Sequence, residues 1–213
     1  MQLTSPNFAD GERIPGENAF AVPDPDQHIV FSENRNPAFS WDDVPENTRS
    51  FALLCIDPDV PSIGDDVNVE GKTIPADLPR VDFVHWVLID IPADVRTIEE
   101  GAFSKGGVVP GGKEGRHDSP REGVNDYTDF FAGDTELEGT YRGYDGPCPP
   151  WNDLLPHRYV FTLYALDVEA LPVSGNFTAR DVLEAMEGHI LAEASLTGTY
   201  SLNPAAQSST RQD

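Results

Sequence analysis

The chain has 213 residues, of which 38% are hydrophobic, and it contains 18 Gly and 19 Pro. This composition is too apolar for a disordered chain and too rich in turn-forming residues for a helical bundle, so we expect one turn-rich, β-dominated globular domain. The 37 acidic residues against 14 basic ones give a net charge of −23, which excludes the electrostatic attraction used to bind nucleic acids or anionic membranes.

The pattern of charge indicates a surface adapted to high salt. Lysine occurs at Lys72, Lys105 and Lys113, and the acidic residues are spread along the chain without forming a single acidic tail. Dense surface carboxylates hold water and counterions, and at high salt the screening of charge suppresses the repulsion between them. An ordinary acidic cytosolic protein is the alternative interpretation of the same composition.

Three apolar runs of strand length predict the centre of the fold. They are Phe51–Ile56, which precedes the turn-forming residues Asp57–Asp59, then Phe83–Ile91, which ends at Pro92, and finally Tyr159–Val168. The runs are rich in β-branched and aromatic residues, which favours strands. Because the runs are almost continuously hydrophobic, we expect strands that are buried on both faces in a central sheet.

Two long polar segments separate the predicted strands, namely residues 62–78 and residues 111–145. Both are rich in charged and turn-forming residues, which predicts loops. Loops of this length within a compact domain usually have a function or form an oligomer interface, so both segments are candidates for either role.

One helix is predicted in the last quarter of the chain. Thr178 is a candidate N-cap with Asp181 at the capping-box position, and apolar residues recur at helical spacing as far as Leu191. This pattern predicts a helix over residues 179–193. Residues 196–202 then have the pattern of a short strand.

The apolar pattern predicts one domain over residues 1–203. Residues 204–213 have no such pattern, which predicts a mobile tail. The first ten residues lack the basic and apolar regions of a signal peptide. No stretch approaches the ~18 consecutive apolar residues of a membrane span. We therefore expect a cytoplasmic protein without a membrane span.

Familiar catalytic and cofactor motifs are missing or incomplete. Residues 107–113 nearly match a phosphate-binding P-loop, but Glu114 replaces the hydroxyl residue that holds magnesium and Pro110 removes a backbone donor. The nucleophile elbow of hydrolases and the zinc-protease helix are absent from the sequence. Cys55 and Cys148 lack metal-site spacing, so free thiols are expected, with one disulfide as the alternative. We expect no cofactor, no metal site and no catalytic residues.

Acidic residues and histidines near the ends of the predicted strands form the strongest candidate site. Asp57 and Asp59 follow the first strand, His85 lies early in the second, and His157 opens the third. Prolines flank the acidic pair and recur in Gly146–Pro150, which makes these loops rigid because proline fixes φ and removes backbone donors. Rigid loops at strand ends are suitable walls for a preformed pocket.

This combination resembles the phosphatidylethanolamine-binding protein family, in its bacterial and archaeal Raf-kinase-inhibitor-like branch. The resemblance covers about residues 1–203 and depends on several motifs that occur in the family's order. The motifs are Ser5-Pro6-Asn7-Phe8 with Gly11 and Ile14-Pro15, Asn36-Pro37 with Phe39-Ser40-Trp41, Val44-Pro45 with Thr48-Arg49-Ser50, Asp57-Pro58-Asp59-Val60-Pro61, His85-Trp86, Gly146-Pro147-Cys148-Pro149-Pro150, His157-Arg158-Tyr159 and the ending 196–201.

The resemblance implies a mainly β fold with a large central antiparallel sheet, a smaller sheet packed on it and a few peripheral helices. It also implies a non-enzymatic protein with an anion pocket that binds a small anion or phospho-ligand such as phosphate, phosphoethanolamine or acetate, has a regulatory role and forms a homodimer. The protein partner of such a role is not identified by the sequence. The pocket residues implied are Asp57, Asp59, His85 and His157, with Tyr159 and the loop residues Gly146, Pro147, Cys148 and Pro149 as walls.

The chemistry of such a pocket follows from its histidines and aspartates. A carboxylate that binds one imidazole nitrogen favours the imidazolium, so we expect the other nitrogen to donate to a bound oxyanion. Three alternatives remain: an inhibitor of a kinase or protease that uses the same pocket, an uncharacterised hydrolase, and a metal site made of His85, His157 and Asp57. The hydrolase lacks a serine placed beside an oxyanion motif, and the spacing of the metal-ligating residues does not demand a metal.

Overall fold

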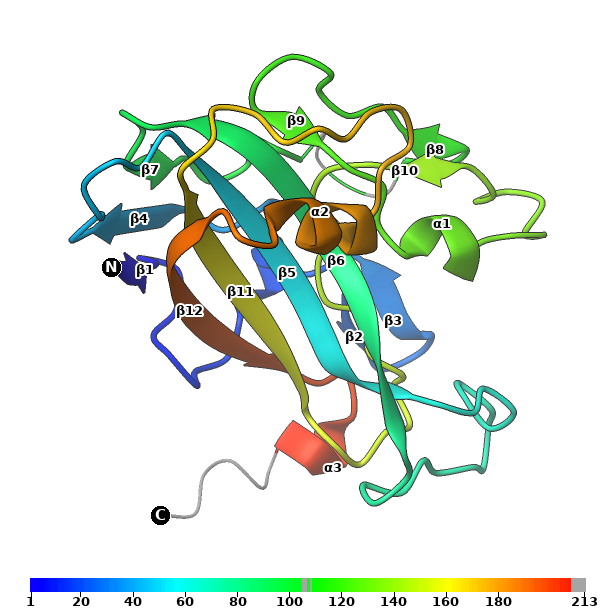
Figure 1. Cartoon of the computed structure of the whole chain (residues 1–213). Helices are drawn as coiled ribbons and strands as arrows, with labels where there is room; N and C mark the ends of the chain where they lie inside the picture. Colours follow the sequence, from blue (N-terminus) through cyan, green and yellow to red (C-terminus); the bar gives the residue numbers. More distant parts are fainter. Residues whose placement is uncertain (105–106, 108, 208–213) are drawn as a thin grey trace.

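A five-stranded antiparallel sheet forms the centre of the computed structural model, which describes residues 1–104, 107 and 109–207 (Figure 1). The strands follow the spatial order β12 (Ile190–Tyr200), β11 (His157–Leu166), β5 (Ser50–Pro61), β6 (Arg80–Pro92) and β9 (Arg121–Glu122). The three predicted strands are thus β5, β6 and β11, which lie side by side in the sheet. The predicted fold class, mainly β with a large antiparallel sheet, is confirmed.

Both faces of this sheet are buried, as its hydrophobic strands predict. Along β5, Phe51 and Leu53 point into a large core on one face, whereas Ala52 and Leu54 point into a smaller core on the other. Side chains alternate between the faces of a sheet, so a strand covered on both sides needs apolar residues at every position. The smaller core is closed by the helix α2 (Ala179–Met186), which lies across this face of the sheet in Figure 1.

Short elements cover the opposite face and the rim. The strands β1 (Gln2–Thr4), β4 (Phe39–Asp42) and β7 (Thr97–Ile98) form a second, smaller sheet, and residues of β1 and β4 pack into the large core. The remaining short elements are η1 (Gly16–Asn18), the hairpin β2 (Ala21–Asp24) with β3 (His28–Phe31), the parallel pair β8 (Gly112–Lys113) with β10 (Thr140–Tyr141), and α1 (Tyr127–Phe130).

The predicted start of the helix is confirmed, and its predicted end is wrong. Thr178 forms a capping box with Asp181, because its side chain accepts a hydrogen bond from Asp181 N while Asp181 accepts one from Thr178 N. The helix stops at Met186, and Gly188 then adopts a left-handed conformation with φ +80° that turns the chain back into β12. Of the apolar residues that extended the predicted helix, Leu191 lies in this strand and is 40% exposed.

The first residues of the predicted tail are ordered against the domain. Residues Pro204–Gln207 form the short helix α3, in which Ala206 is 3% exposed. Asn203 accepts a hydrogen bond from Ala205 N at 2.9 Å and donates one to the backbone oxygen of Asp153 at 2.9 Å. The rest of the predicted tail, residues 208–213, lies outside the described residues. Within the described part of the chain, no helix has the length and apolar character needed to cross a membrane.

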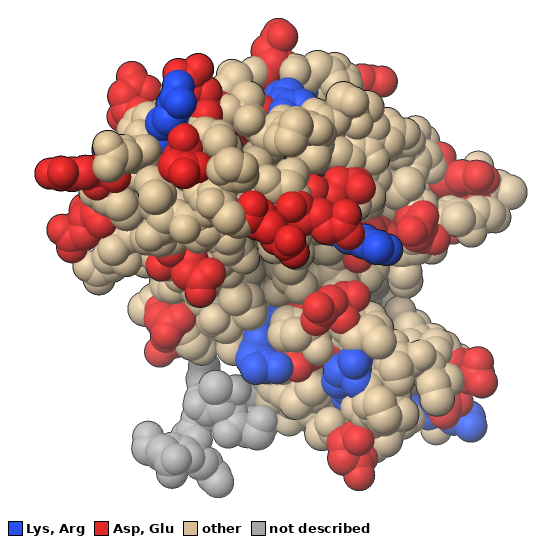
Figure 2. Space-filling model, in the orientation of Figure 1, with Lys and Arg blue, Asp and Glu red and all other residues tan. Residues whose placement is uncertain are grey.

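Among the charged residues on the surface drawn in Figure 2, acidic ones are more frequent than basic ones. Acidic side chains are spread over this face, and basic side chains are few. Several basic residues are also bound to carboxylates inside the fold, as in the pairs Lys113–Asp145 and Arg121–Asp90. The net charge of −23 therefore acts mainly as repulsion between surface groups.

This repulsion predicts that salt stabilises the protein, and it tests the predicted adaptation to high salt. At 2 M KCl the Debye length is below ~3 Å, so repulsion beyond neighbouring groups is screened. Each kcal/mol recovered raises the Tm of a domain of this size by about 2–4 °C. We expect the Tm to rise by at least ~5 °C between 0.1 M and 2 M KCl, a gain of roughly 2 kcal/mol. Differential scanning calorimetry measures the Tm at both KCl concentrations, and an uncharged osmolyte of equal osmolality is the control. An unchanged Tm would contradict the prediction.

Candidate functional site

A pocket of about 490 Å³ lies where the ends of β5, β6 and β11 meet at one edge of the central sheet. Loops and short elements from four other parts of the chain complete its walls. Its lining residues are Phe20, Ile29, Phe31, Asp57, Val60, Pro61, Gly64, Val67, Asn68, Phe83, His85, Tyr127, Phe130, Phe131, Leu137, Cys148, Pro149, Pro150, His157 and Tyr159. Five buried side chains with polar atoms thus share one pocket with a larger number of apolar ones, namely Asp57, His85, Tyr127, His157 and Tyr159.

A β-bulge directs His85 into this pocket. In the pairing of β5 with β6, Cys55 lies opposite Trp86 and Ile56 lies opposite Val84, so His85 is an extra residue on β6. A bulge changes the direction of the side chains around it. Trp86 therefore packs into the large core while its neighbour His85 lines the pocket.

A second bulge shapes the acidic motif and corrects the predicted end of β5. Asp57 pairs with Phe83 and Val60 pairs with Val81, which leaves one extra residue on β5 between them. The strand therefore continues through the two prolines to Pro61 instead of ending before Asp57. The prolines are tolerated because the bulge interrupts the regular ladder of hydrogen bonds.

The two aspartates of the motif have different surroundings. Asp57 lines the pocket, whereas Asp59 faces Arg158 and accepts hydrogen bonds from its backbone N at 2.9 Å and from its guanidinium Nε and Nη2, both at 2.8 Å. Burial raises the pKa of the Asp59 carboxyl, but the hydrogen bonds and charge of Arg158 outweigh this and bring it below its usual value. Asp59 therefore stabilises the contact between the ends of β5 and β11 and does not line the pocket.

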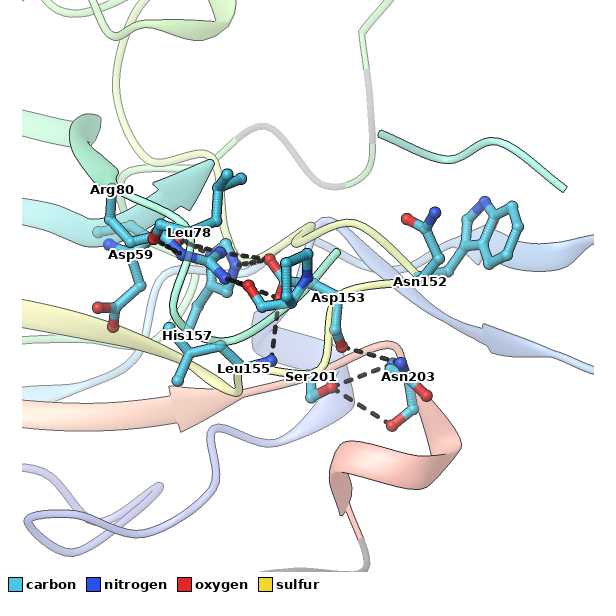
Figure 3. Close-up of polar contacts among 12 residues, drawn as sticks. Asp59, Leu78, Arg80, Asn152, Asp153, Leu155, His157, Ser201 and Asn203 are labelled. Atoms are coloured by element: carbon cyan, nitrogen blue, oxygen red, sulfur yellow. Dashed lines mark hydrogen bonds and ion pairs between the residues drawn. The ribbon is translucent and has the colours of Figure 1, made fainter. Parts of the chain in front are cut away.

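His157 has both ring nitrogens bound by carboxylates. Its Nδ1 lies 2.7 Å from Oδ2 of Asp57. Its Nε2 lies 3.1 Å from Oδ2 of Asp153 (Figure 3). Burial lowers the pKa of this imidazole, but the hydrogen bonds from both carboxylates outweigh burial and raise the pKa to about 9. His157 is therefore an imidazolium at neutral pH, and the prediction that one of its nitrogens is free to donate to an oxyanion is wrong.

Asp153 and Arg80 extend this arrangement, and sequence analysis missed both. The guanidinium of Arg80 binds Asp153 through Nη1 at 2.5 Å and through Nη2 at 3.1 Å, and its remaining donors bind backbone oxygens of Pro75, Leu78 and Asp59. The row Asp57, His157, Asp153 and Arg80 alternates in sign (part of it is drawn in Figure 3). The charges of this row cancel, and two of its members, Asp57 and His157, line the pocket.

His85 provides an acceptor. Its Nδ1 lies 2.7 Å from the backbone oxygen of Asp145, and because a carbonyl only accepts, Nδ1 carries the proton. Burial lowers the pKa of His85, against the opposing effect of Asp57 and Asp145, so the ring is neutral at pH 7. Its Nε2, which has no hydrogen-bond partner within the described residues, is then an acceptor on the pocket side.

The side chain of Asp145 is a fully buried anchor behind His85. It accepts hydrogen bonds from Asn34 and Asn125, each at 2.8 Å, and lies 2.9 Å from the ammonium of Lys113. Lys113 also donates to the backbone oxygen of Tyr144. The lysine of the P-loop-like segment therefore holds Asp145 in place, and part of that segment, residue 108, lies outside the described residues.

Tyr159 provides a donor. Its hydroxyl is buried without a hydrogen-bond partner among the described residues, and its ring centre lies 5.0 Å from that of His85. Burial raises the pKa of the phenol well above its usual value, so the hydroxyl keeps its proton. A buried hydroxyl without a partner has a free-energy cost that a bound acceptor removes.

Only some residues of the Gly146–Pro150 loop line the pocket. Cys148 and Pro149 line the pocket, whereas Gly146 N donates to Asn34 at 2.7 Å and Pro147 O accepts from Phe20 N at 2.9 Å on the far side. Both cysteines are free thiols, so the alternative of a disulfide is not realised. Burial raises the pKa of Cys148 to about 12, which keeps it protonated.

The predicted site residues therefore fall into two groups. Six of them line the pocket and three lie behind its walls. The lining residues are Asp57, His85, Cys148, Pro149, His157 and Tyr159, and those behind the walls are Asp59, Gly146 and Pro147. Across the described residues, no three His, Cys, Asp or Glu side chains are grouped so as to hold a metal ion.

Part of the apolar wall comes from segments that sequence analysis treated as loops. The long segment 111–145 contributes Phe130, Phe131 and Leu137, and residues 62–78 contribute Val67. Phe130 is 60% exposed, so an aromatic side chain also lies at the mouth. No regular spacing links these residues in the sequence. Both segments have a place in the pocket, and the homodimer interface stays a prediction.

Fold and pocket together define a class of mainly β proteins in which a large antiparallel sheet carries a preformed pocket at the ends of its strands. The chain belongs to the phosphatidylethanolamine-binding protein family, whose sequence pattern matches residues 4–201. This finding confirms the resemblance inferred from the motifs.

Individual relatives place the chain within the family. A UPF0098 protein of Methanothermobacter thermautotrophicus is 38% identical over 200 residues, which cover 94% of this chain and 98% of the relative. The UPF0098 protein YbhB of Escherichia coli is 31% identical, with 94% and 100% covered. The crystal structure of Escherichia coli YbcL, described as a new member of the mammalian PEBP family, aligns with a TM-score of 0.66 at 27% identity and covers 94% of this chain and 97% of YbcL.

Proposed function

We propose that this protein is a non-enzymatic binding module whose pocket takes a small ligand with an anionic head, such as a phosphate group, and an apolar group attached to it. The observation that carries the proposal is that two polar atoms with no hydrogen-bond partner among the described residues, Nε2 of His85 and the hydroxyl of Tyr159, lie at the base of an otherwise mainly apolar pocket. Binding pockets commonly combine a few placed polar groups with an apolar lining.

The size of the pocket supports the apolar part of the ligand. A single phosphate would fill a fraction of the 490 Å³, and aromatic side chains such as Phe83 and Phe131 line the space that is left. Burial of apolar surface contributes about 25 cal/mol per Å² to affinity before the costs of association. An aryl or alkyl phosphate is therefore a better match than inorganic phosphate.

The pocket offers little support for hydrolysis. Among the described lining residues, Cys148 is the only thiol, and none of them is a serine, threonine or lysine. With a pKa of about 12 the thiol of Cys148 is protonated, and the thiolate is the nucleophilic form. His157, whose nitrogens both face carboxylates, is unavailable as a general base.

The test of this function is the affinity of phenyl phosphate for the protein and for Tyr159→Phe, measured by calorimetry at pH 6 in high KCl. Loss of a hydrogen bond to a charged group costs about 1.5–3 kcal/mol, so the variant should bind at least ~10-fold more weakly. The hydroxyl has no partner among the described residues, so its removal leaves the Tm unchanged or raises it. Tyr164→Phe, on the opposite face of β11, is the matched control and should bind normally. Failure of the unmodified protein to bind at millimolar ligand would refute the proposal.

A further inference from the structure

We infer that the pocket requires a head group that itself carries a proton, such as a phosphate monoester in its singly charged form, and that it rejects a sulfate ester of the same shape. The inference rests on the proposed function and specifies the ligand class of the same site. It comes from counting the hydrogen-bond donors and acceptors that remain available at the base of the pocket.

The count leaves more acceptors than donors. The carboxylate of Asp57 accepts only: Oδ1 already accepts from Asp59 N and Oδ2 from His157 Nδ1, each at 2.7 Å, and each oxygen keeps a second lone pair. Nε2 of the neutral His85 ring is also an acceptor. Both N–H groups of His157 are used by Asp57 and Asp153, so this histidine donates nothing to the pocket. At the base, the strong free donor among the described side chains is the hydroxyl of Tyr159, because the protonated thiol of Cys148 is a weak donor.

Other groups around the base do not change this balance. The hydroxyl of Tyr127 donates to the backbone oxygen of Gly146 at 2.9 Å, and Asn68 lies exposed at the mouth. None of the described lining residues is a lysine or arginine. The positive charge nearest the base is that of His157, which lies between the carboxylates of Asp57 and Asp153.

A head group without a proton is therefore a poor match. Its oxygens offer lone pairs, and at the base they would meet the lone pairs of Asp57 and of His85 Nε2. A P–OH group instead donates to one of these acceptors, while a second, charged oxygen accepts from Tyr159. The Asp57 carboxylate thereby selects a protonated ligand. An unprotonated ligand oxygen would face the lone pairs of this carboxylate without a hydrogen bond, which is unfavourable.

The titratable groups that face His85 keep the same protonation states between pH 6 and 8. They are Asp57, Asp145, His157, Tyr127, Tyr159 and Cys148. Burial raises the pKa of both tyrosines well above its usual value, and that of Cys148 to about 12. Changes in affinity between pH 6 and 8 should then come from the ligand.

The deciding experiment compares phenyl phosphate with phenyl sulfate by isothermal titration calorimetry on the unmodified protein at pH 6. At this pH about half of the phosphate is singly charged, since its second pKa is about 6, and this form has the same shape and charge as phenyl sulfate and differs from it by one proton. We expect phenyl phosphate to bind about 10–150-fold more tightly, the equivalent of one hydrogen bond to a charged group. Above the second pKa the affinity of phenyl phosphate should fall about tenfold per pH unit, while that of phenyl sulfate stays flat.

The outcomes separate this inference from the proposed function. Equal binding of the two esters, or tighter binding of phenyl phosphate as the pH rises above 6, overturns the requirement for a proton and leaves the proposed function standing. Binding of neither ester overturns the proposed function itself.

A variant pair locates the selectivity. Asp57→Asn replaces an acceptor oxygen with an amide donor, so the preference for phosphate over sulfate should fall at least ~10-fold. Asp59→Asn, which changes the neighbouring carboxylate outside the pocket, should leave the preference unchanged. Because the comparison of the two esters uses the unmodified protein, it decides the inference even if Asp57→Asn does not fold.

Discussion

Replacement of Asp153 by alanine should destabilise the protein by about 3–5 kcal/mol, the cost of leaving a buried charge without its partner. Two cations depend on this one carboxylate, since Arg80 binds it through two nitrogens and the imidazolium of His157 binds it through Nε2. The side chain of Asp153 is 1% exposed, so water cannot replace it. Urea unfolding followed by circular dichroism gives the free energy of unfolding.

A second histidine and aspartate pair is the matched control for Asp153→Ala. His189 and Asp167 lie 2.8 Å apart, but their side chains are 43% and 44% exposed. Exposed ion pairs contribute about 0–1 kcal/mol, so Asp167→Ala should have a small effect. If the two alanine variants lose equal stability, the row of alternating charges does not have the role assigned to it.

Stability should also fall as the pH rises through the weakly alkaline range. The pKa of His157 is about 9 in the folded protein and about 6.5 in an unfolded chain. The folded state thus binds its proton more tightly, so this stabilisation is fully present below pH 6.5 and is lost as the pH rises through 9. The total is about 3 kcal/mol, of which about 2 kcal/mol disappears between pH 7 and pH 8.5.

Chemical unfolding at pH 7.0 and 8.5 measures this loss. The range stops at 8.5 because burial raises the pKa of both cysteines, and their ionisation in the unfolded chain destabilises the fold at higher pH. His157→Gln removes the titrating group and should give nearly the same stability at both pH values. A loss of 2 kcal/mol in this variant as well would assign the effect to other groups.

Local signals in the sequence predicted the elements better than their ends. The apolar runs located β5, β6 and β11, and Thr178 located the start of α2. The errors at Asp57 and after Met186 have different causes. The bulge on β5 depends on pairing with the neighbouring strand, which the apolar pattern does not contain. Gly188 is a local signal that ends a helix, and the apolar period that continued to Leu191 obscured it.

In the candidate site, motifs predicted some residues, and other residues were missed. Asp57, His85, His157 and Tyr159 carried a motif, and the structure brings them into one pocket. Asp153 was missed although it lies four residues before His157, because irregular chain joins the two and this spacing predicts no contact there. Its other partner, Arg80, is 73 residues away in the sequence. The aromatic walls were missed because their side chains come from several segments, around Phe20, Phe31, Phe83 and Phe130, and face the pocket only in the folded chain.

The wide separation of the pocket residues has a consequence for folding. Asp57 and His157 are 100 residues apart, and Asn34 and Asp145 are 111 apart, so both contacts require almost the whole topology. Contacts between distant residues form slowly, because the intervening chain must lose entropy before they provide any stabilisation. The pocket should therefore be completed late in folding. When refolding is monitored by the recovery of ligand binding, it should be slower than when it is monitored by the circular dichroism of the strands. A protein made on a ribosome would become competent to bind after the last strand, β12, has emerged.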